Sequence, residues 1–400
     1  MGIYKDNKKM KKRFIIFTVS ILILFFAYII YSKYIYSPLI FKIRSDFEKP
    51  ILIKNIPKGI ESLSSKGCAA CHQEIYEEWA ASMHAKAYID PLFQAYWRKD
   101  NNIWICLNCH TPLQNQQDFI ITGFEKGNIK KPITQKNEDF SHELREEGIT
   151  CATCHVRDGV ILGPYGDTNA PHPTKYDPIF KSTAICDRCH QVPSGKTMLY
   201  IANPCNTSEE FHGGPYASKG YVCQTCHMPE VERPMAADSP IRKVRQHLWR
   251  GGYSPDMVKR ALMVSLDKKI NNGMIDLILK IKNSGAGHKV PTGDPDRYIT
   301  VHFDVINKKG EILKSKQYSI GRWIIWKPII IEVYENRIKP HESNEYKFNY
   351  NVSAGDEIMV KVVYHIMTER AKNKLKKKYG LKEDISIEYK IFEEIIPLNP

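Results

Sequence analysis

The longest apolar run of the chain lies close to its N-terminus. From Phe14 to Tyr31 eighteen residues carry no charge, and the apolar character continues to Tyr36. A run of this length can cross a bilayer as an α-helix. The basic residues before it and the aromatic residues at its far end predict that the bulk of the chain lies outside the cytoplasm, on the periplasmic or extracellular side. A cleaved signal peptide is the alternative, but no Ala-x-Ala cleavage site follows, so residues 1–36 are expected to form a basic cytoplasmic flank and an uncleaved transmembrane anchor.

Beyond about residue 265, short β-branched or aromatic runs alternate with turn residues. These runs begin at Met274, Tyr298, Trp323 and Met359. Strands of this length separated by turns predict a β-sandwich-like domain over residues 265–370. A basic C-terminal tail is expected over residues 371–400, in which the helical run Lys372–Lys378 presents a solvated face.

Between these segments the hydrophobic periodicity is weak. A spacer of mixed charge is expected over residues 37–66, and residues 67–250 are rich in Pro, Gly and Asn. Local helices such as Gln73–Tyr88 are expected within an otherwise irregular domain. The predicted fold class is therefore α+β: an N-terminal transmembrane helix, a mainly α-helical or irregular domain, and a C-terminal β-sandwich-like domain. The middle region needs a further source of packing, which bound cofactors can supply.

Ten of the eleven cysteines lie in five Cys-x-x-Cys-His motifs. Such a string would occur by chance only about 0.01 times in a chain of this composition, and its spacing is the haem c attachment signature. Two thioether bonds hold the porphyrin, and the adjacent imidazole lies under the iron as the proximal ligand. Residues 67–250 are therefore predicted to be a pentahaem cytochrome c domain with five covalently bound haem c groups. The attachment cysteines are Cys68, Cys71, Cys106, Cys109, Cys151, Cys154, Cys186, Cys189, Cys223 and Cys226, and the proximal histidines are His72, His110, His155, His190 and His227.

Zinc sites and structural disulfides are the competing interpretations of these cysteines. Zinc ribbons do not require a histidine after every second cysteine, and disulfides do not require one either. The remaining cysteine, Cys205, is expected to be a bystander thiol, with a thiolate haem ligand and an intermolecular disulfide as alternatives.

Six of the nine histidines outside the motifs are candidate distal ligands of haem iron. They are His84, His142, His172, His212, His247 and His288. His84 follows His72 by twelve residues, about 18 Å along a helix, so it would serve a haem other than its own. His288 lies in a glycine-rich loop that could deliver an imidazole across the domain interface. Six candidates for five irons permit bis-histidine ligation throughout, which favours electron relay; the same count also permits one open iron.

The net charge of +14 does not change this interpretation. Six Lys or Arg residues lie in the first thirteen positions, and haem propionates would offset much of the remainder. No nucleic-acid partner is therefore expected.

Four stretches of sequence resemble the multihaem cytochrome c family that includes the tetrahaem electron acceptor of hydroxylamine oxidoreductase. They are Cys68-Ala-Ala-Cys-His-Gln-Glu-Ile-Tyr-Glu-Glu-Trp-Ala-Ala-Ser-Met-His84, then His142 with Gly148-Ile-Thr-Cys151 after a polar segment, then Ala170-Pro-His-Pro, and finally Val222-Cys-Gln-Thr-Cys-His-Met-Pro229. The resemblance covers about residues 60–230. It implies that His84 ligates a neighbouring haem and that haems stack in parallel and perpendicular pairs. The Cys-x-x-Cys-Lys motif of pentahaem nitrite reductases does not occur in the sequence.

These observations predict a membrane-anchored pentahaem cytochrome c with no catalytic residues. It would pass electrons in respiration from a donor at the membrane to a periplasmic or extracellular acceptor, and its partners would be redox proteins. Two alternatives remain: an oxidoreductase acting on a small nitrogen or sulfur compound at a five-coordinate haem, or a subunit of a larger respiratory haem assembly.

Overall fold

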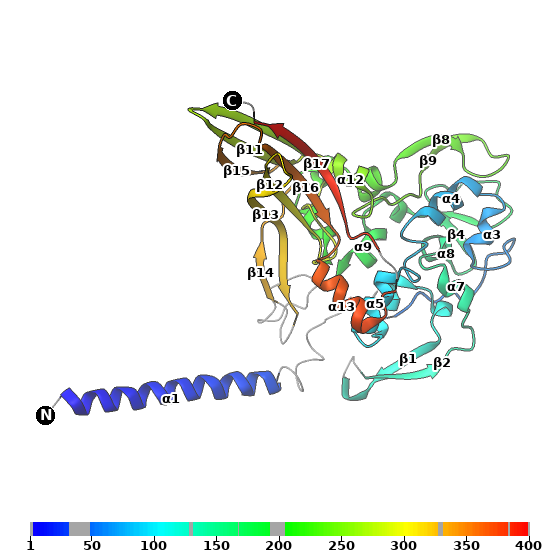
Figure 1. Ribbon diagram of the computed structural model, residues 1–400. Helices are drawn as coiled ribbons and strands as arrows, with labels where there is room; N and C mark the ends of the chain where they lie inside the picture. Colours follow the sequence, from blue (N-terminus) through cyan, green and yellow to red (C-terminus); the bar gives the residue numbers. More distant parts are fainter. Residues whose placement is uncertain are drawn as a thin grey trace.

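The computed structural model describes residues 3–31, 49–127, 131–166, 168–192, 205–326, 331–382 and 385–398. It contains a long N-terminal helix, a region of short helices and strands that carries the motifs, and a domain of long strands (Figure 1). The fold is thus a mixture of helix and sheet, as predicted.

Helix α1 (Ile3–Ile30) contains the apolar run. The window Arg13–Ile30 has a mean hydropathy of 2.5, and none of it is buried inside the protein. Exposed apolar side chains over this length are typical of a helix that a membrane surrounds, and a signal sequence has the same composition. The last residues of the expected anchor, 32–36, lie outside the described residues.

The motif region is built from short elements. Its helices are α3 (Ser65–Ala69), α4 (Gln73–Ala81), α5 (Pro91–Lys99), α6 (Leu107–His110), α7 (His142–Glu146), α8 (Cys151–His155), α9 (Ala184–His190), α10 (Thr207–His212) and α11 (Cys223–His227). Its strands are β1 (Phe119–Phe124), β2 (Pro132–Lys136), β3 (Val156–Arg157), β4 (Val160–Gly163), β5 (Thr174–Tyr176), β6 (Gln191–Val192), β7 (Cys205–Asn206), β8 (Glu230–Pro234) and β9 (Ile241–Arg245). Five 3-10 turns, η2 (Trp104–Cys106), η3 (Gln114–Gln116), η4 (Glu125–Gly127), η5 (Pro178–Lys181) and η6 (Ala217–Lys219), connect them.

The helix expected over Gln73–Tyr88 is shorter in the structure. Helix α4 ends at Ala81, because Ser82 takes an extended conformation and its hydroxyl donates a hydrogen bond to the Trp79 carbonyl. The following residues therefore turn back, and His84 lies beyond the helix rather than along its axis.

The second domain contains the long strands. After α12 (Pro255–Ala261) come β10 (Leu262–Asn271), β11 (Met274–Asn283), β12 (Tyr298–Ile306), β13 (Ile312–Ile325), β14 (Ile331–Glu335), β15 (Ser343–Asn351), β16 (Glu357–His365), α13 (Glu369–Tyr379) and β17 (Glu388–Pro397). Strands β10, β11 and β15 form one sheet, and β14, β13, β12, β16 and β17 form the other in that order. Every pairing in these two sheets is antiparallel.

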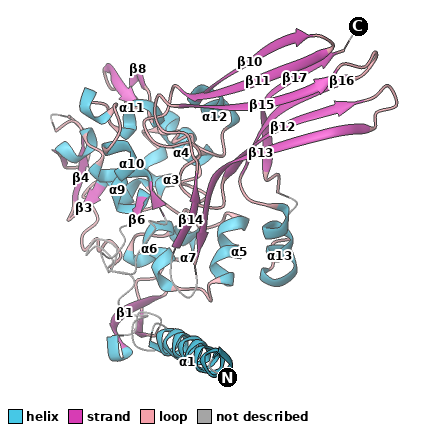
Figure 2. Ribbon diagram, turned by 90° about the vertical axis from the view of Figure 1, so that its left-hand side faces the viewer, coloured by secondary structure: helices cyan, strands magenta, loops and turns pink. Residues whose placement is uncertain are grey.

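The two sheets share one apolar core. Alternate residues of each strand point inward, such as Leu277 and Leu279 on β11 and Val301 and Phe303 on β12, all at most 1% exposed. Figure 2 shows these strands running together on the side of the molecule away from the motif helices. This arrangement is the sandwich that the alternating β-branched runs predict.

The C-terminal boundary of the β domain differs from the expected one at residue 370. Strand β17 pairs with β16 along its whole length, and Leu398 belongs to the same core. Residues 388–398 are therefore part of the sandwich rather than of a tail. The mixed pattern of charged and apolar residues in β17 fits an edge strand with one wet face.

Candidate functional site

Each Cys-x-x-Cys-His motif lies in or beside one turn of helix. Helices α6, α8, α9 and α11 end at the motif histidine, and α3 contains the first cysteine of the first motif. In a helical turn, residues i, i+3 and i+4 share one face. Both sulfurs and the imidazole of a motif therefore point to the same side, which is the arrangement that double thioether attachment and proximal ligation require.

Backbone carbonyls orient four of the five motif histidines. The Nδ1 atoms of His72, His110, His155 and His227 lie 2.6–2.8 Å from the carbonyl oxygens of Met235, Ala87, Leu162 and Arg250. A carbonyl can only accept, so Nδ1 carries the proton in each case. The Nε2 atom is then the unprotonated nitrogen that can bind a metal.

Three of the predicted distal histidines lie opposite a motif histidine. His84 pairs with His190, His247 with His155, and His288 with His227, and in each pair the ring centroids are 6.3 Å apart. Two imidazoles bound on opposite sides of one ion, with metal–nitrogen bonds of about 2 Å, have centroids about 6 Å apart. The three separations therefore fit one iron between each pair of rings.

His172 lies near the first motif. Burial, followed by the charge of His72, lowers the pKa of His172. Its loop is held by a close approach of Gly59, which has φ +89°, where a Cβ would lie 2.3 Å from the Pro171 carbonyl oxygen. A glycine at position 59 thus lets the Pro171–His172 backbone pass this close.

The distal histidines of the three pairs are half-buried, and their pKa values are lowered. Burial, with a smaller effect of His190, lowers the pKa of His84 to about 3. Burial also lowers the pKa of His247 and of His288 to about 4. A neutral imidazole is the form that binds metal, so burial favours ligation at neutral pH.

Hydrogen bonds to the backbone hold the distal histidines in place. The Nδ1 atoms of His247 and His288 lie 2.9 Å from the carbonyl oxygens of Arg245 and Lys289, which leaves each Nε2 for a metal. The His84 carbonyl accepts a hydrogen bond from the Ile149 amide, and Gly148, at φ +62°, allows this approach because a Cβ there would lie 2.7 Å from the same carbonyl. Positioning of this kind is typical of residues around metal ligands.

Sequence reasoning missed several residues that support the site. Glu78 on α4 accepts hydrogen bonds from the His247 amide and from Arg233. Burial opposes ionisation of Glu78, but these hydrogen bonds prevail and hold its pKa below the usual range. Trp249 contacts both His84 and His247, at ring-centroid distances of 4.5 and 5.1 Å. Trp249 lies in no sequence motif, and Glu78, although it lies within the stretch Cys68–His84, has no sequence signal that links it to His247.

Two other predicted ligands lie elsewhere. The His142 side chain is 71% exposed and lies 3.8 Å from Glu146, and the Nε2 atom of His212 lies 3.1 Å from the Thr183 hydroxyl. Neither ring is in contact with a motif histidine, although all fourteen histidines fall within the described residues.

Cysteines of different motifs lie near one another. The thiols of Cys68 and Cys151, of Cys109 and Cys189, and of Cys186 and Cys223 are close enough to shift each other's pKa. The fourth motif is thus near both the second and the fifth, and the first is near the third. Cys205, outside the motifs, lies 3.5 Å from the His190 carbonyl oxygen.

The β domain contributes His288 and is fixed to the motif region by a buried ion pair. Arg337 lies 2.8 Å from Glu210 on α10, and both side chains are 4% exposed. Thr292 also donates a hydrogen bond to Glu210. These contacts hold the loop that carries His288 against the fifth motif.

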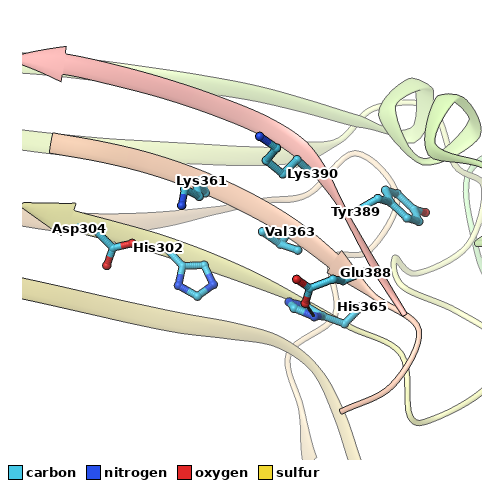
Figure 3. Close-up of a pocket in the computed structure, with 8 residues that line it drawn as sticks. All are labelled: His302, Asp304, Lys361, Val363, His365, Glu388, Tyr389 and Lys390. Atoms are coloured by element: carbon cyan, nitrogen blue, oxygen red, sulfur yellow. Dashed lines mark ion pairs between the residues drawn. The ribbon is translucent and has the colours of Figure 1, made fainter. Parts of the chain in front are cut away.

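A separate polar cavity of about 500 Å³ lies on the outer face of the five-stranded sheet (Figure 3). Inside it, the His365 Nδ1 atom lies 2.9 Å from Glu388, and the Thr300 hydroxyl lies 2.7 Å from one ring nitrogen of both His302 and His365. None of the motif residues lines it.

Comparisons with known proteins support the fold. The chain is similar to the crystal structure of a penta-haem cytochrome c552 from Thermochromatium tepidum, with 19% identity and a TM-score of 0.62 over 83% of this chain and 98% of that one. Two partial matches are too weak to support any conclusion. A β-glucuronidase from Bacteroides uniformis has 9% identity and a TM-score of 0.18 over 34% of this chain and 13% of that one. A putative β-galactosidase from Bacteroides fragilis has 14% identity and a TM-score of 0.16 over 37% of this chain and 16% of that one. No family model and no curated protein matches the chain.

The first comparison bears on the predicted resemblance. A multihaem cytochrome c shares the fold over most of this chain, which agrees with the motifs. The closer resemblance to the family of the hydroxylamine oxidoreductase electron acceptor stays a prediction.

Proposed function

We propose that the chain is a membrane-anchored pentahaem c-type cytochrome that relays electrons between a donor at the membrane and an acceptor outside it. The observation that carries the proposal is the set of three histidine pairs with the same 6.3 Å ring separation, each joining a motif histidine to one of the predicted distal residues. Haem c supplies a reversible one-electron couple at each iron.

The residues present fit this cofactor better than they fit zinc. In the described part of the chain, no group of three or more His, Cys, Asp or Glu side chains is placed to hold a metal ion. A structural zinc site needs four protein ligands, whereas an iron in a porphyrin needs only the two axial ones. Paired imidazoles beside paired cysteines are what the porphyrin requires.

We assign His84, His247 and His288 as the distal ligands opposite His190, His155 and His227. His172 is the corresponding residue for His72. Irons held between two imidazoles have no open position, so these four sites transfer electrons and do not bind substrate. Cysteines of neighbouring motifs lie near one another, so the attachment sites are close together, which a relay requires.

The ligand assignment is tested with His84→Ala, using His142→Ala as the matched control. Both changes remove an imidazole, but only His84 faces a motif histidine. In the electron paramagnetic resonance spectrum of the oxidised protein, we expect one iron to change from low spin to high spin in His84→Ala and none in His142→Ala. An unchanged spectrum in the first variant, or the same change in both, would contradict the assignment.

The relay function is tested by voltammetry of the full chain adsorbed on an electrode. We expect reversible signals that account for five electrons and that do not change on addition of nitrite or hydroxylamine. A catalytic current with either compound would instead favour the oxidoreductase alternative.

One observation favours a second function at the second motif. The His110 ring stacks on Phe93 at 3.7 Å and has no ring contact with another histidine, although all fourteen histidines are described. A haem held by His110 would then have an iron position open to a small nitrogen or sulfur compound. Cyanide titration of the oxidised protein should show one binding site per chain. No binding, or an absorption band near 695 nm that indicates a methionine ligand, would refute this second function.

A further inference from the structure

The end of the β13–β14 hairpin exposes a cluster of large apolar side chains. Trp323 is 60% exposed, Val333 and Tyr334 are each 49%, Trp326 is 46% and Ile325 is 37%. Trp323 and Tyr334 face each other across the two strands. We call these five residues the aromatic end of the hairpin.

This cluster is not explained by the core of the sandwich. On the same strand, Ile320 is fully buried and Ile324 is 5% exposed, so the inward positions of β13 are already filled. Trp323 and its cross-strand partner Tyr334 lie on the outward face, which in an antiparallel sheet is normally polar where water covers it. Single exposed apolar residues are ordinary, but several large ones gathered at one end mark an interaction site.

A basic helix lies on the same side of the molecule. Helix α13 carries Arg370 and five lysines against the single acidic residue Glu369, and Lys374, Lys377 and Lys378 are exposed. Its inner face is fixed, because Leu375 is buried and the Tyr379 carbonyl accepts a hydrogen bond from Arg98 on α5. The positive charges are therefore presented outward from a rigid support.

The aromatic end and α13 lie at the same end of the five-stranded sheet, because Tyr298 of β12 pairs with Gly321 of β13 on one side and with His365, the last residue of β16 before α13, on the other. Figure 1 shows α13 beside the lower ends of β13 and β14. The chain between Tyr31 and Lys49 has seventeen residues, which span at most about 60 Å when fully extended. If α1 crosses a bilayer, Lys49 at the start of the motif region is held within this distance of the membrane surface, and the β domain packed on that region is kept near the membrane with it.

We propose that the aromatic end and α13 form a second contact with the bilayer that α1 crosses, on its outer leaflet. Tryptophan and tyrosine are the side chains enriched at the membrane–water interface, where their rings lie among the headgroups. The lysines of α13 complement anionic lipid phosphates. Because α1 already confines the domain near the surface, even a weak contact is populated. The contact fixes the orientation of the motif region relative to the membrane, and it rests on the proposed membrane anchor.

The test uses the full haem-loaded chain in lipid nanodiscs that contain phosphatidylcholine and phosphatidylglycerol. A spin label is attached at Val333→Cys, and at Met263→Cys as the matched control, both in a Cys205→Ser background. Met263 is 60% exposed but lies on β10 in the other sheet. We expect the label at 333 to collide more with lipid-soluble oxygen than with a water-soluble nickel complex, and the label at 263 to show the reverse.

Each other outcome contradicts the proposal in a distinct way. Equal behaviour of the two labels would show that the hairpin stays in water. Protection of the label at 333 from both reagents would show a protein–protein contact instead. Charge reversal at Lys374, Lys377 and Lys378 should reduce the oxygen contact at position 333, and an unchanged value would exclude α13 from the surface. A mature chain whose mass lacks residues 1–31 would refute the anchor itself, and with it this contact.

Discussion

The motif region and the β domain reach stability in different ways. The β domain has one continuous core in which both sheets bury alternate residues and to which Leu92 and Ala95 of α5 also belong, whereas the separate buried cluster of the motif region consists of Ile51, Leu63, Leu113, Leu144, Ala152 and Val156. Smaller and divided burial of this kind offsets less of the conformational entropy of the long loops in the motif region. We infer from this contrast that the β domain is stabilised mainly by its own side chains, whereas the motif region needs the haem groups bound to its cysteines to complete its packing.

The largest expected effect comes from removing one attachment site of the motif region. Cys186→Ser/Cys189→Ser abolishes attachment at the fourth motif, whose cysteines lie near the second and fifth motifs. We expect rapid proteolysis within residues 67–250 while the β domain stays resistant. Cys205→Ser is the control, because this thiol lies outside the motifs. Equal resistance of both variants would mean that the motif region does not depend on its cofactors.

The reverse experiment removes core volume from the β domain. Phe303 is fully buried against Phe348, with ring centroids 5.2 Å apart. Phe303→Ala should lower the free energy of unfolding of the β domain by about 3–5 kcal/mol, measured by urea denaturation.

The same substitution tests whether the two regions fold independently. As long as the native fold persists, the haem absorbance of Phe303→Ala should stay unchanged. A loss of haem together with the lost stability would show that the two regions fold as one unit.

Breaking the buried ion pair between the two regions should have a smaller effect on the free energy of unfolding. Glu210→Gln keeps the shape of the side chain but removes the charge that faces Arg337, which retains Glu335 as a second partner. We expect a loss of about 1–3 kcal/mol in the free energy of unfolding. Glu146→Gln, at an exposed pair with His142, is the control and should have almost no effect. Equal losses in the two variants would contradict a special role for the buried pair.

The smallest expected effect is a change in the pKa of His365, which lines the cavity of the β domain. Burial lowers the pKa of His365, and Glu388 opposes this shift. A depressed histidine pKa in the folded state contributes stability above about pH 6.5, and that contribution is lost as the pH falls through the folded pKa. Glu388→Gln should lower the pKa of His365 further, as measured by nuclear magnetic resonance titration. Glu393→Gln, at the Lys390 pair, should leave it unchanged.

The sequence predicts the β domain well where β-branched and aromatic residues are dense along a strand. The runs at Met274, Tyr298 and Met359 correspond to β11, β12 and β16. Strands β10, β15 and β17 were not anticipated, because their outward positions are charged or polar and only every second residue is buried, as with Tyr346 and Phe348 on β15. Short alternating segments of this kind are hard to distinguish from loops.

In the motif region, local spacing predicts the positions of the cysteines and proximal histidines but not the partners of the distal ones. His84 and His190 are far apart in sequence, and only the turn after α4 brings them together. His142 was expected to be a ligand because a similar histidine precedes the fifth motif. Helix α7 instead buries Leu144 and Arg145 and leaves His142 outward. Sequence recurrence does not determine which face of a short helix meets a neighbour.

The proximity of cysteines of different motifs also bears on how the chain matures. If the chain is translocated to an oxidising compartment and compacts before it receives its cofactors, Cys68 would lie near Cys151 and Cys109 near Cys189, and thiols so placed form disulfides there. Premature collapse would then block the sulfurs that must react with vinyl groups. In that case haem attachment would depend on a reductant and on loading that precedes, or keeps pace with, compaction.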